Sequence, residues 1–464
     1  MTHVHSSLLW RSAIHHDICD INDVDFYDGS DGDLNDMHEL DELEFIDELS
    51  GLSGDDDICR KARKERWLHI RLCWALHSKK LVHEGEFERT YGMSLDSFNG
   101  LVTILDPMVR RHTNMSRSPQ PISVELIVAT SMRYLRGGCV NDLKNVYGLS
   151  RTEVYCCRDS FLHGVLKCET LDISLPKSAE EWEKVRQGFQ SKSTDQFIDG
   201  CVGALDGFLQ KTICPRKKEV GGAVEGYRSG HYLCFGLNCQ ALVDASLKFR
   251  FFGVVAPGST NDSAAIQRAE GLLEIINSLP KGLFVVGDAA YALSEHLLIP
   301  FIGCQSEVIE HDVYNFYISQ LRIRVEMAFG LFVKKFGILR SAMQTSVKTT
   351  TKILVVCARL HNFLIDRHII ENEGENIDHL YHDNFSNRTS VRDAPDGMQY
   401  LPTIPNAFEE IDGYSQIRHT IIEKIREKNI RRPLHNIVRN EPRKERVNNE
   451  GIFDGIPTMF YAPR

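Results

Sequence analysis

The chain has 464 residues, of which 42% are hydrophobic and 25% are charged, an ordinary composition for a globular protein of two or three domains. The most apolar stretch, residues 282–304, is interrupted by Asp288, Glu295 and His296, so no segment is predicted to cross a membrane. The 13 cysteines include no CxxC pair and no signal peptide is recognised, which favours reduced thiols inside the cell over disulfides or a structural zinc site.

The net charge of −10 is unevenly distributed along the chain. Residues 17–57 contain 17 Asp and Glu and no Lys or Arg, so the rest of the chain has 64 − 17 = 47 acids against 54 bases, a balance of +7. Residues 1–58 are therefore predicted to form a disordered acidic arm. The mildly basic remainder is compatible with a nucleic-acid partner without being diagnostic of one.

Residues 59–175 are predicted to form a helical domain. Its basic cluster at residues 60–66 can serve as a nuclear-import signal, a phosphate-contacting face or the exposed side of a helix. Residues 139–166 have the pattern helix, turn, helix, with Gly148 in the turn and a capping box formed by Ser150 and Glu153. The second helix could enter a DNA groove, but because only Arg151 and Arg158 are basic there, plain helical packing is an equal alternative.

Residues 195–367 are predicted to form an α/β unit. Three strand-like runs are followed by a helix, a buried strand in GLFVVGD, a helix at about Leu321 to Gly337 and a last buried helix, KILVVCARLHNFLI. This order describes a mixed sheet covered by helices. Residues 368–464 are predicted to be a polar linker that carries one basic helix.

Four acidic residues lie at the edges of these apolar segments: Asp206, Asp262, Asp288 and Glu326. Converging carboxylates repel one another unless they share a cation, and hard divalent ions such as Mg²⁺ or Mn²⁺ choose oxygen ligands. The pattern indicates metal-assisted phosphoryl transfer. Each position also has a structural alternative, namely a turn at Asp206, a helix cap at Asp262, a loop at Asp288 and an ion pair between Glu326 and Arg322.

Five motifs containing these residues follow one another in the order GALDGF, PGSTNDS, GDAAYAL, RVEMAFGLFVKKFGIL and LHNFLI. Together they resemble the DDE endonuclease domain of PIF/Harbinger-type transposases and of their host-domesticated nuclease relatives, over roughly residues 90–370. The resemblance implies a ribonuclease-H-like mixed-sheet core with Asp206 at the end of the first strand, Asp288 just beyond the fourth and Glu326 on a later helix. It implies that these three residues are catalytic, and that with Asp262 they bind Mg²⁺ or Mn²⁺, as two ions.

The resemblance also implies a nuclear DNA endonuclease or transposase that cleaves transposon ends and joins the freed 3′-OH to target DNA. Recognition of the ends would then need a separate Myb/SANT-like DNA-binding protein, and a homo-oligomer is compatible with this. Basic residues that follow the acids are candidate phosphate contacts: Arg216, Lys217, Lys218, Lys334, Lys335 and Arg340. One alternative is a domesticated DNA- or chromatin-binding protein without nuclease activity, and a more distant one is a carboxylate-pair hydrolase such as a glycosidase.

Overall fold

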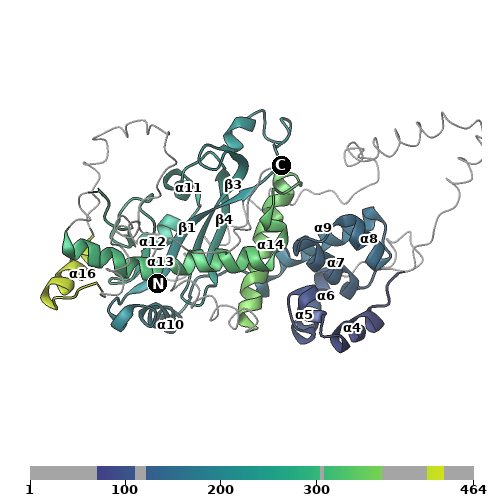
Figure 1. Cartoon of the computed structure of the whole chain (residues 1–464), viewed down its shortest axis with the longest axis horizontal. Helices are drawn as coiled ribbons and strands as arrows, with labels where there is room; N and C mark the ends of the chain where they lie inside the picture. Colours follow the sequence, from purple (N-terminus) through teal and green to yellow (C-terminus); the bar gives the residue numbers. More distant parts are fainter. Residues whose placement is uncertain (1–70, 110–121, 304–307, 368–414, 433–464) are drawn as a thin grey trace, which may run out of the picture.

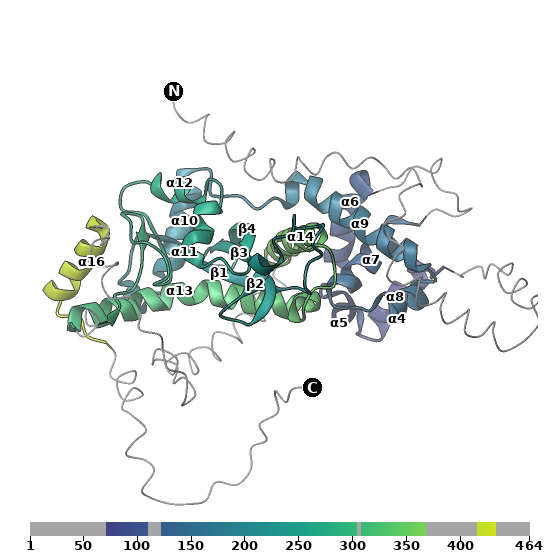
Figure 2. The same cartoon turned by 90° about the horizontal axis from the view of Figure 1, so that it is seen from above.

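The computed structural model describes residues 71–109, 122–303, 308–367 and 415–432 (Figure 1). The predicted acidic arm, residues 1–58, and most of residues 368–464 lie outside the described residues. In the described part a mixed sheet lies at the centre, with a group of helices at one end of it (Figures 1 and 2). No helix in this part combines the length and the apolar character needed to cross a membrane.

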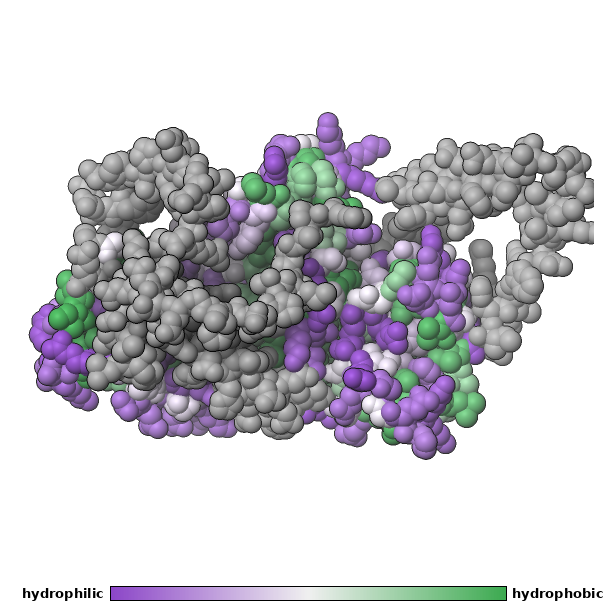
Figure 3. Space-filling view, in the orientation of Figure 1, coloured by the Kyte–Doolittle hydropathy of each residue, from purple (hydrophilic) through white to green (hydrophobic). Residues whose placement is uncertain are grey.

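The group of helices precedes the sheet in the chain. Its members are α4 (Trp74–His83), α5 (Phe87–Tyr91), α6 (Leu95–Val109), α7 (Val124–Leu135), α8 (Val140–Tyr147) and α9 (Arg151–Lys167). Aromatic side chains fill the space between the first three, with Trp74 stacked on Phe98 at 4.8 Å between ring centroids. Figure 3 shows hydrophilic and hydrophobic residues intermingled on the outer surface of these helices.

Helices α8 and α9 correspond to the predicted helix-turn-helix. Gly148 ends α8 with a positive φ of 62°, and both hydrogen bonds of the capping box at Ser150 and Glu153 are present, as predicted. Arg158 of α9 is only 11% exposed and stacks on Tyr155 with 4.9 Å between its guanidinium carbon and the ring centroid. The predicted entry of α9 into a DNA groove stays a prediction.

Six strands from the described residues form the sheet, and they confirm the predicted mixture of parallel and antiparallel pairs. The strand order is β2-β3-β1-β5-β6, and β4 pairs with β3. Strands β1, β3 and β4 pair antiparallel, whereas β5 is parallel to β1 and to β6. The strands are β1 (Cys201–Lys211), β2 (Arg228–Ser229), β3 (Cys234–Val243), β4 (Phe249–Pro257), β5 (Phe284–Val286) and β6 (Leu297–Leu298).

Helices cover both faces of the sheet. In Figure 2 the long helix α13 (Ile309–Lys335) runs along one face, and α10, α11 and α12 lie on the other. All three residues of β5 are buried, as expected of a parallel strand covered on both sides. The other α-helices of the described residues are α10 (Ala179–Gln190), α11 (Asp262–Arg268), α12 (Leu272–Asn277), α14 (Val347–Asp366) and α16 (Gln416–Glu427).

Helix α13 begins earlier than predicted. The sequence placed its start at about Leu321, but it starts at Ile309, because Tyr317 and Val313 continue the buried stripe one and two turns upstream. The predicted stripe itself is confirmed, with Leu321 and Phe332 both fully buried. The result is a 27-residue helix that packs along β1 and reaches beyond the sheet to α16.

Arg359 of α14 joins the helical group to the sheet. Its Nη1 donates hydrogen bonds to the backbone oxygens of Val165 and Leu166 at the end of α9, at 2.9 and 2.8 Å, and its Nη2 pairs with Asp172 at 2.5 Å. A cation at this position adds donors to carbonyls at a helix terminus, where Val165 also accepts a hydrogen bond from the backbone N–H of Cys168 at 3.3 Å. Gly337, which follows α13, packs closely on the end of α7, since a Cβ there would overlap the backbone oxygen of Arg136. We call these contacts between the helical group and the rest of the protein the joint.

The buried ring of His361 makes the stability of this core dependent on pH. Its Nε2 donates a hydrogen bond to the backbone oxygen of Leu247 at 2.8 Å, and burial lowers its pKa from 6.5 to about 4. A base whose pKa is lowered by folding contributes its full share to the free energy of unfolding above pH 6.5. This contribution is lost as the pH falls toward 4, because the unfolded chain then takes up the proton more readily than the native protein does. At 1.36 kcal/mol per unit, the 6.5 − 4 = 2.5 unit difference corresponds to about 3 kcal/mol.

We therefore expect wild type to lose more stability between pH 7 and pH 4 than His361→Gln, whose amide cannot titrate. Urea unfolding of both proteins at a series of pH values measures this difference. If the two stability curves stay parallel through that range, protonation of His361 is not the cause of acid destabilisation.

Candidate active site

Asp206 and Asp288 are brought together by the parallel pairing of β1 with β5. Ala204 lies opposite Val286 in this ladder, so Asp206 comes two residues later within β1, and Asp288 comes two residues later in the loop that follows β5, as its loop alternative predicted. Parallel strands direct their carboxyl ends to the same edge and lie about 4.8 Å apart, which places both acids side by side at that edge. Asp288 is exposed and accepts a hydrogen bond from the backbone N–H of Ala289 at 2.7 Å.

The structure corrects the expected position of Asp206. The resemblance implied the end of the first strand, but β1 runs from Cys201 to Lys211 and Asp206 lies in its middle. The reason is that β1 continues past its partner β5 and keeps its antiparallel pairing with β3, in which Asp206 lies opposite Ala241. Asp206 is thus on a part of β1 that, among the described strands, has no partner on its β5 side.

Glu326 reaches the same place from α13. It lies one helical turn after Arg322, whose Nη1 contacts both Oε1 of Glu326 at 2.6 Å and Oδ2 of Asp206 at 3.3 Å. The predicted ion pair between Arg322 and Glu326 is therefore present, but the same nitrogen also joins a carboxylate from the sheet. One guanidinium links the helix acid to the strand acid.

Burial and neighbouring charges shift the pKa of Asp206 strongly. Burial raises the pKa of Asp206 to about 7, and the negative charges of Asp288 and Glu326 add to the rise. Arg322 and the backbone N–H of Gly207, which donates to Oδ1 of Asp206 at 2.8 Å, act in the opposite direction. Mutual repulsion among three converging carboxylates is the electrostatic condition that a shared cation relieves.

Asp262 approaches β1 from the α11 side. It is the first residue of α11, and the helix is capped by Asn261 instead, so the alternative that Asp262 is the cap is wrong. Its Oδ1 accepts hydrogen bonds from the side-chain amides of Asn238 at 3.1 Å and Gln240 at 3.0 Å. The carboxylate lies directly over Gly207, where a Cβ would overlap it.

Three polar side chains of this site were not predicted from the sequence: Asn238, Gln240 and Tyr291. The hydroxyl of Tyr291 donates to Oε1 of Gln240 at 2.7 Å, so a chain of hydrogen bonds connects Tyr291 to Asp262. Burial raises the pKa of Tyr291 far above its usual range, and the charges of Asp206, Asp262 and Asp288 contribute. Tyr291 therefore stays protonated at neutral pH and can act as a donor that orients Gln240.

The sequence of β3 contained a pattern that could have identified two of these three residues. Asn238 and Gln240 are two positions apart in an otherwise apolar strand, so both side chains point to one face of the sheet. Buried polar side chains need partners, which indicated a polar feature on that face.

The donor atoms at this site fit a hard divalent cation. Carboxylate oxygens are the ligands that Mg²⁺ and Mn²⁺ prefer, and a positively charged group, Arg322, already lies between two of them. Within the described ranges, however, no group of three or more His, Cys, Asp or Glu side chains is close enough to hold a metal ion as it stands. The residues suit a metal, but some of their side chains would have to move to bind one.

The predicted phosphate contacts are only partly surface residues. Arg216, Lys217 and Lys218 are exposed in the loop after β1, whereas Lys335 is buried, which corrects its expected place on a DNA-facing surface. Arg340 donates to the backbone oxygens of Val333 and Lys334 and so closes the end of α13.

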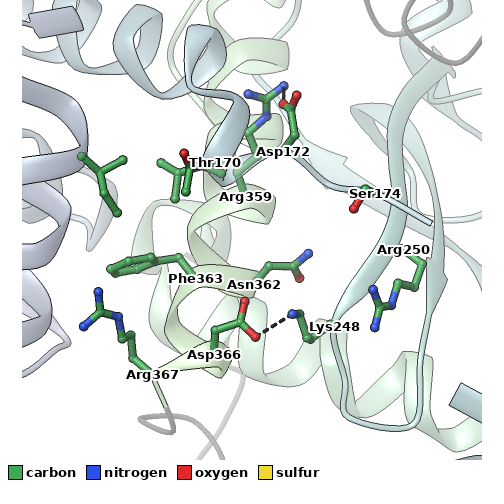
Figure 4. Close-up of a pocket in the computed structure, with 12 residues that line it drawn as sticks. Thr170, Asp172, Ser174, Lys248, Arg250, Arg359, Asn362, Phe363, Asp366 and Arg367 are labelled. Atoms are coloured by element: carbon green, nitrogen blue, oxygen red, sulfur yellow. Dashed lines mark hydrogen bonds and ion pairs between the residues drawn. The ribbon is translucent and has the colours of Figure 1, made fainter. Parts of the chain in front are cut away.

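A separate cavity of about 230 Å³ lies between α14, the start of β4 and the segment after α9 (Figure 4). None of the four predicted acids lines it. Its charged groups are already paired, Lys248 with Asp366 at 2.6 Å and Arg359 with Asp172 (Figure 4). It belongs to the joint between the helices and the sheet, not to the group of acids.

Gly207 is expected to be sensitive to the smallest substitution. In Gly207→Ala the new methyl group would overlap the carboxylate of Asp262, so Asp262 must turn away from the amides of Asn238 and Gln240, or β1 or α11 must shift, at a cost of about 1–3 kcal/mol. Chemical denaturation measures this loss. Gly226→Ala is the matched control, because a Cβ at that position meets no atom within 4 Å.

The double variant Gly207→Ala/Asp262→Ala tests the cause of that loss. Because the second substitution removes the overlapping group, the double variant should be more stable than the sum of the two single effects predicts. Additive losses would show that the close approach of Gly207 to Asp262 is not what limits position 207.

The mixed sheet covered by helices agrees with the family that comparison with known proteins finds. Residues 205–362 match the family model described as the DDE superfamily endonuclease. The chain therefore carries a DDE superfamily endonuclease domain, and the resemblance to Harbinger-type proteins drawn from its motifs is confirmed.

Two kinds of curated relatives are similar to 60% of this chain. The mouse protein named "Putative nuclease HARBI1" is 22% identical over 279 residues, which cover 60% of this chain and 76% of the relative, and its rat counterpart is 21% identical. "Protein ALP1-like" of Arabidopsis thaliana is 22% identical over 301 residues, covering 60% of this chain and 70% of the relative. No solved structure matches the chain significantly.

Proposed function

We propose that the protein is a divalent-metal-dependent DNA endonuclease of the transposase type, which hydrolyses phosphodiester bonds and can join the freed 3′-OH to a second DNA. The single observation that carries this proposal is the β1–β5 register, which sets Asp206 beside Asp288 while α13 presents Glu326 to Asp206 through Arg322. The match to the endonuclease family model supports it.

Asp206, Asp288 and Glu326 would hold the metal, and Asp206 would be the shared ligand, because both other acids act on it. When bound, a pair of divalent cations supplies activation of water and stabilisation of the leaving oxygen in an in-line displacement. The amide contacts from Asn238 and Gln240 hold Asp262 in one orientation, so Asp262 serves either as a further ligand or as the residue that positions β1.

The exposed side chains of Arg216, Lys217 and Lys218 follow β1 and are proposed to bind DNA phosphates beside the acids. We further propose that the protein acts in the nucleus and relies on a separate Myb/SANT-like protein to select its DNA site. Both ideas rest on the family resemblance, and the exposed basic loop supports only the contact with DNA.

Nicking of supercoiled plasmid tests the proposal. The purified protein is incubated with Mg²⁺ or Mn²⁺, with EDTA, and with Asp288→Asn in place of wild type. We expect relaxed circles only from wild type with a divalent ion. Nicking that persists in EDTA, or equal nicking by Asp288→Asn, would contradict a metal site at these acids.

If wild type and variant are both inactive, the same assay is repeated with nuclear extract that contains candidate partner proteins. DNA binding measured in parallel then distinguishes an enzyme without its partner from a binding protein without activity. Cleavage restored by the extract for wild type but not for Asp288→Asn would support the enzyme.

A further inference from the structure

Arg322 occupies the centre of the group of acids. Its Nη1 lies 2.6 Å from Oε1 of Glu326 and 3.3 Å from Oδ2 of Asp206, and the negative charge of Asp288 acts on the same guanidinium. The side chains of Arg322 and Asp206 are each 19% exposed, and that of Glu326 is 28% exposed. The contacts are therefore largely shielded from water.

An ordinary helical ion pair does not account for this arrangement. Arg322 and Glu326 are four residues apart on α13 and would pair on an isolated helix, with a small gain in stability. Asp206, however, is 116 residues away in sequence and comes from the central sheet. By joining the two, Arg322 holds α13 to β1 at the place where the negative charges converge.

The position of the guanidinium conflicts with metal binding to the same oxygens. Divalent cations bind carboxylate oxygens at about 2.0–2.6 Å and need both acids to turn toward one point. The space between Oδ2 of Asp206 and Oε1 of Glu326 is filled by Nη1 of Arg322. Because a guanidinium is always charged and only donates hydrogen bonds, it also repels an approaching cation.

We propose that Arg322 is the internal counter-ion of the metal-free site, and that it must leave Asp206 and Glu326 before a divalent cation can bind to them. This inference rests on the proposed function, because it assigns a regulator to the proposed metal site. In the metal-free protein Arg322 neutralises part of the charge of three acids and keeps the site folded. On metal binding it is displaced, so the ion binds more weakly than the bare acids would allow.

Two consequences of opposite sign follow for a variant that lacks the charge. Arg322→Gln leaves Asp206 and Glu326 without their counter-ion, so the metal-free variant should unfold at a lower temperature than wild type. The same variant has no cation to displace, so Mn²⁺ should bind at least about tenfold more tightly, since close charge pairs couple by this much or more.

The experiment is calorimetric titration of the full chain with Mn²⁺ in the absence of DNA, together with thermal unfolding in EDTA and in Mn²⁺. Wild type is compared with Arg322→Gln and with Arg322→Lys, which keeps the charge. Arg340→Gln is the matched control, because Arg340 follows the same helix but contacts backbone oxygens instead of the acids. We expect tighter binding and a larger Mn²⁺-induced rise in Tm only for Arg322→Gln.

Each result decides one point. Equal Mn²⁺ affinity in wild type and Arg322→Gln would overturn the counter-ion role and leave the proposed metal site intact. Weaker binding by Arg322→Gln would also overturn it, since Arg322 would then be positioning the acids for the metal. If neither protein binds Mn²⁺, the proposed metal site itself is contradicted, and the inference with it. If Arg322→Gln does not fold, Arg322→Met, which also removes the charge but keeps an apolar side chain, replaces it, with the same tighter binding of Mn²⁺ expected and equal or weaker binding overturning the counter-ion role.

Discussion

Asp206→Asn is expected to lower the rate of metal-dependent strand cleavage by at least about 10³-fold. Asp206 is the acid on which both Asp288 and Glu326 act, and it is the ligand proposed to be shared. Loss of a shared ligand removes several kcal/mol of transition-state stabilisation, and about 4 kcal/mol corresponds to that factor. The initial rate of plasmid nicking under excess Mn²⁺ measures the effect.

The substitution is chosen so that the fold survives. Asn has nearly the same shape as Asp, and burial raises the pKa of Asp206 to about 7, so the native site already accommodates a neutral group there. Stability in EDTA should therefore change little. Asp366→Asn is the matched control, because that acid pairs with Lys248 on an exposed part of the joint and should leave nicking unchanged.

Two results would contradict this expectation. Asp206→Asn with more than one tenth of wild-type nicking would show that the acid on β1 is not required for the reaction. Loss of nicking together with loss of folding in EDTA would make Asp206 a structural residue, and circular dichroism of the variant distinguishes the two cases.

The largest effect on stability is expected at Arg359. Arg359→Met should lower the free energy of unfolding by about 3 kcal/mol, because two charge-assisted hydrogen bonds to the end of α9 are lost and the oxygen of Val165 is left with the longer hydrogen bond from the backbone N–H of Cys168, at 3.3 Å. The ion pair with Asp172 adds little to this figure, since Asp172 is 48% exposed. Urea unfolding monitored by fluorescence measures the change.

Arg367→Met is the control for that measurement. Arg367 follows α14 just beyond Arg359, but its side chain is 38% exposed and lies 3.9 Å from Asp96, a distance at which a surface pair contributes little. If both variants lose the same stability, the joint between α9 and α14 does not depend on Arg359. A loss below about 1 kcal/mol for Arg359→Met would lead to the same conclusion.

Local patterns predicted much of the fold. The apolar runs that became β1, β3, β4 and β5 were recognisable because strands have a period of two and helices one of 3.6. The capping box at Ser150 and the stripe on α13 were found for the same reason, since both depend on neighbours within one or two turns. The start of α13 was missed because its first turns mix polar and apolar residues.

The roles of single polar residues were harder to predict. Arg322 was expected to pair with Glu326, which is a local contact, but its second contact with Asp206 depends on how α13 packs on β1. Gln240 and Tyr291 meet only because the sheet and the loop after β5 come together. Lys335 was expected on the surface, but the packing of the last turn of α13 buries it.

The sequence by itself determined the positions of the four acidic residues and the segments that form strands and helices. Its motifs identified the endonuclease domain. These properties depend on residue types and on periods of a few residues. Only the tertiary structure decided that Ala204 lies opposite Val286, which brings Asp206 to Asp288, and that a guanidinium lies between Asp206 and Glu326. Strand register and helix packing arise from burial shared by segments that are far apart in the chain, and no local pattern encodes them.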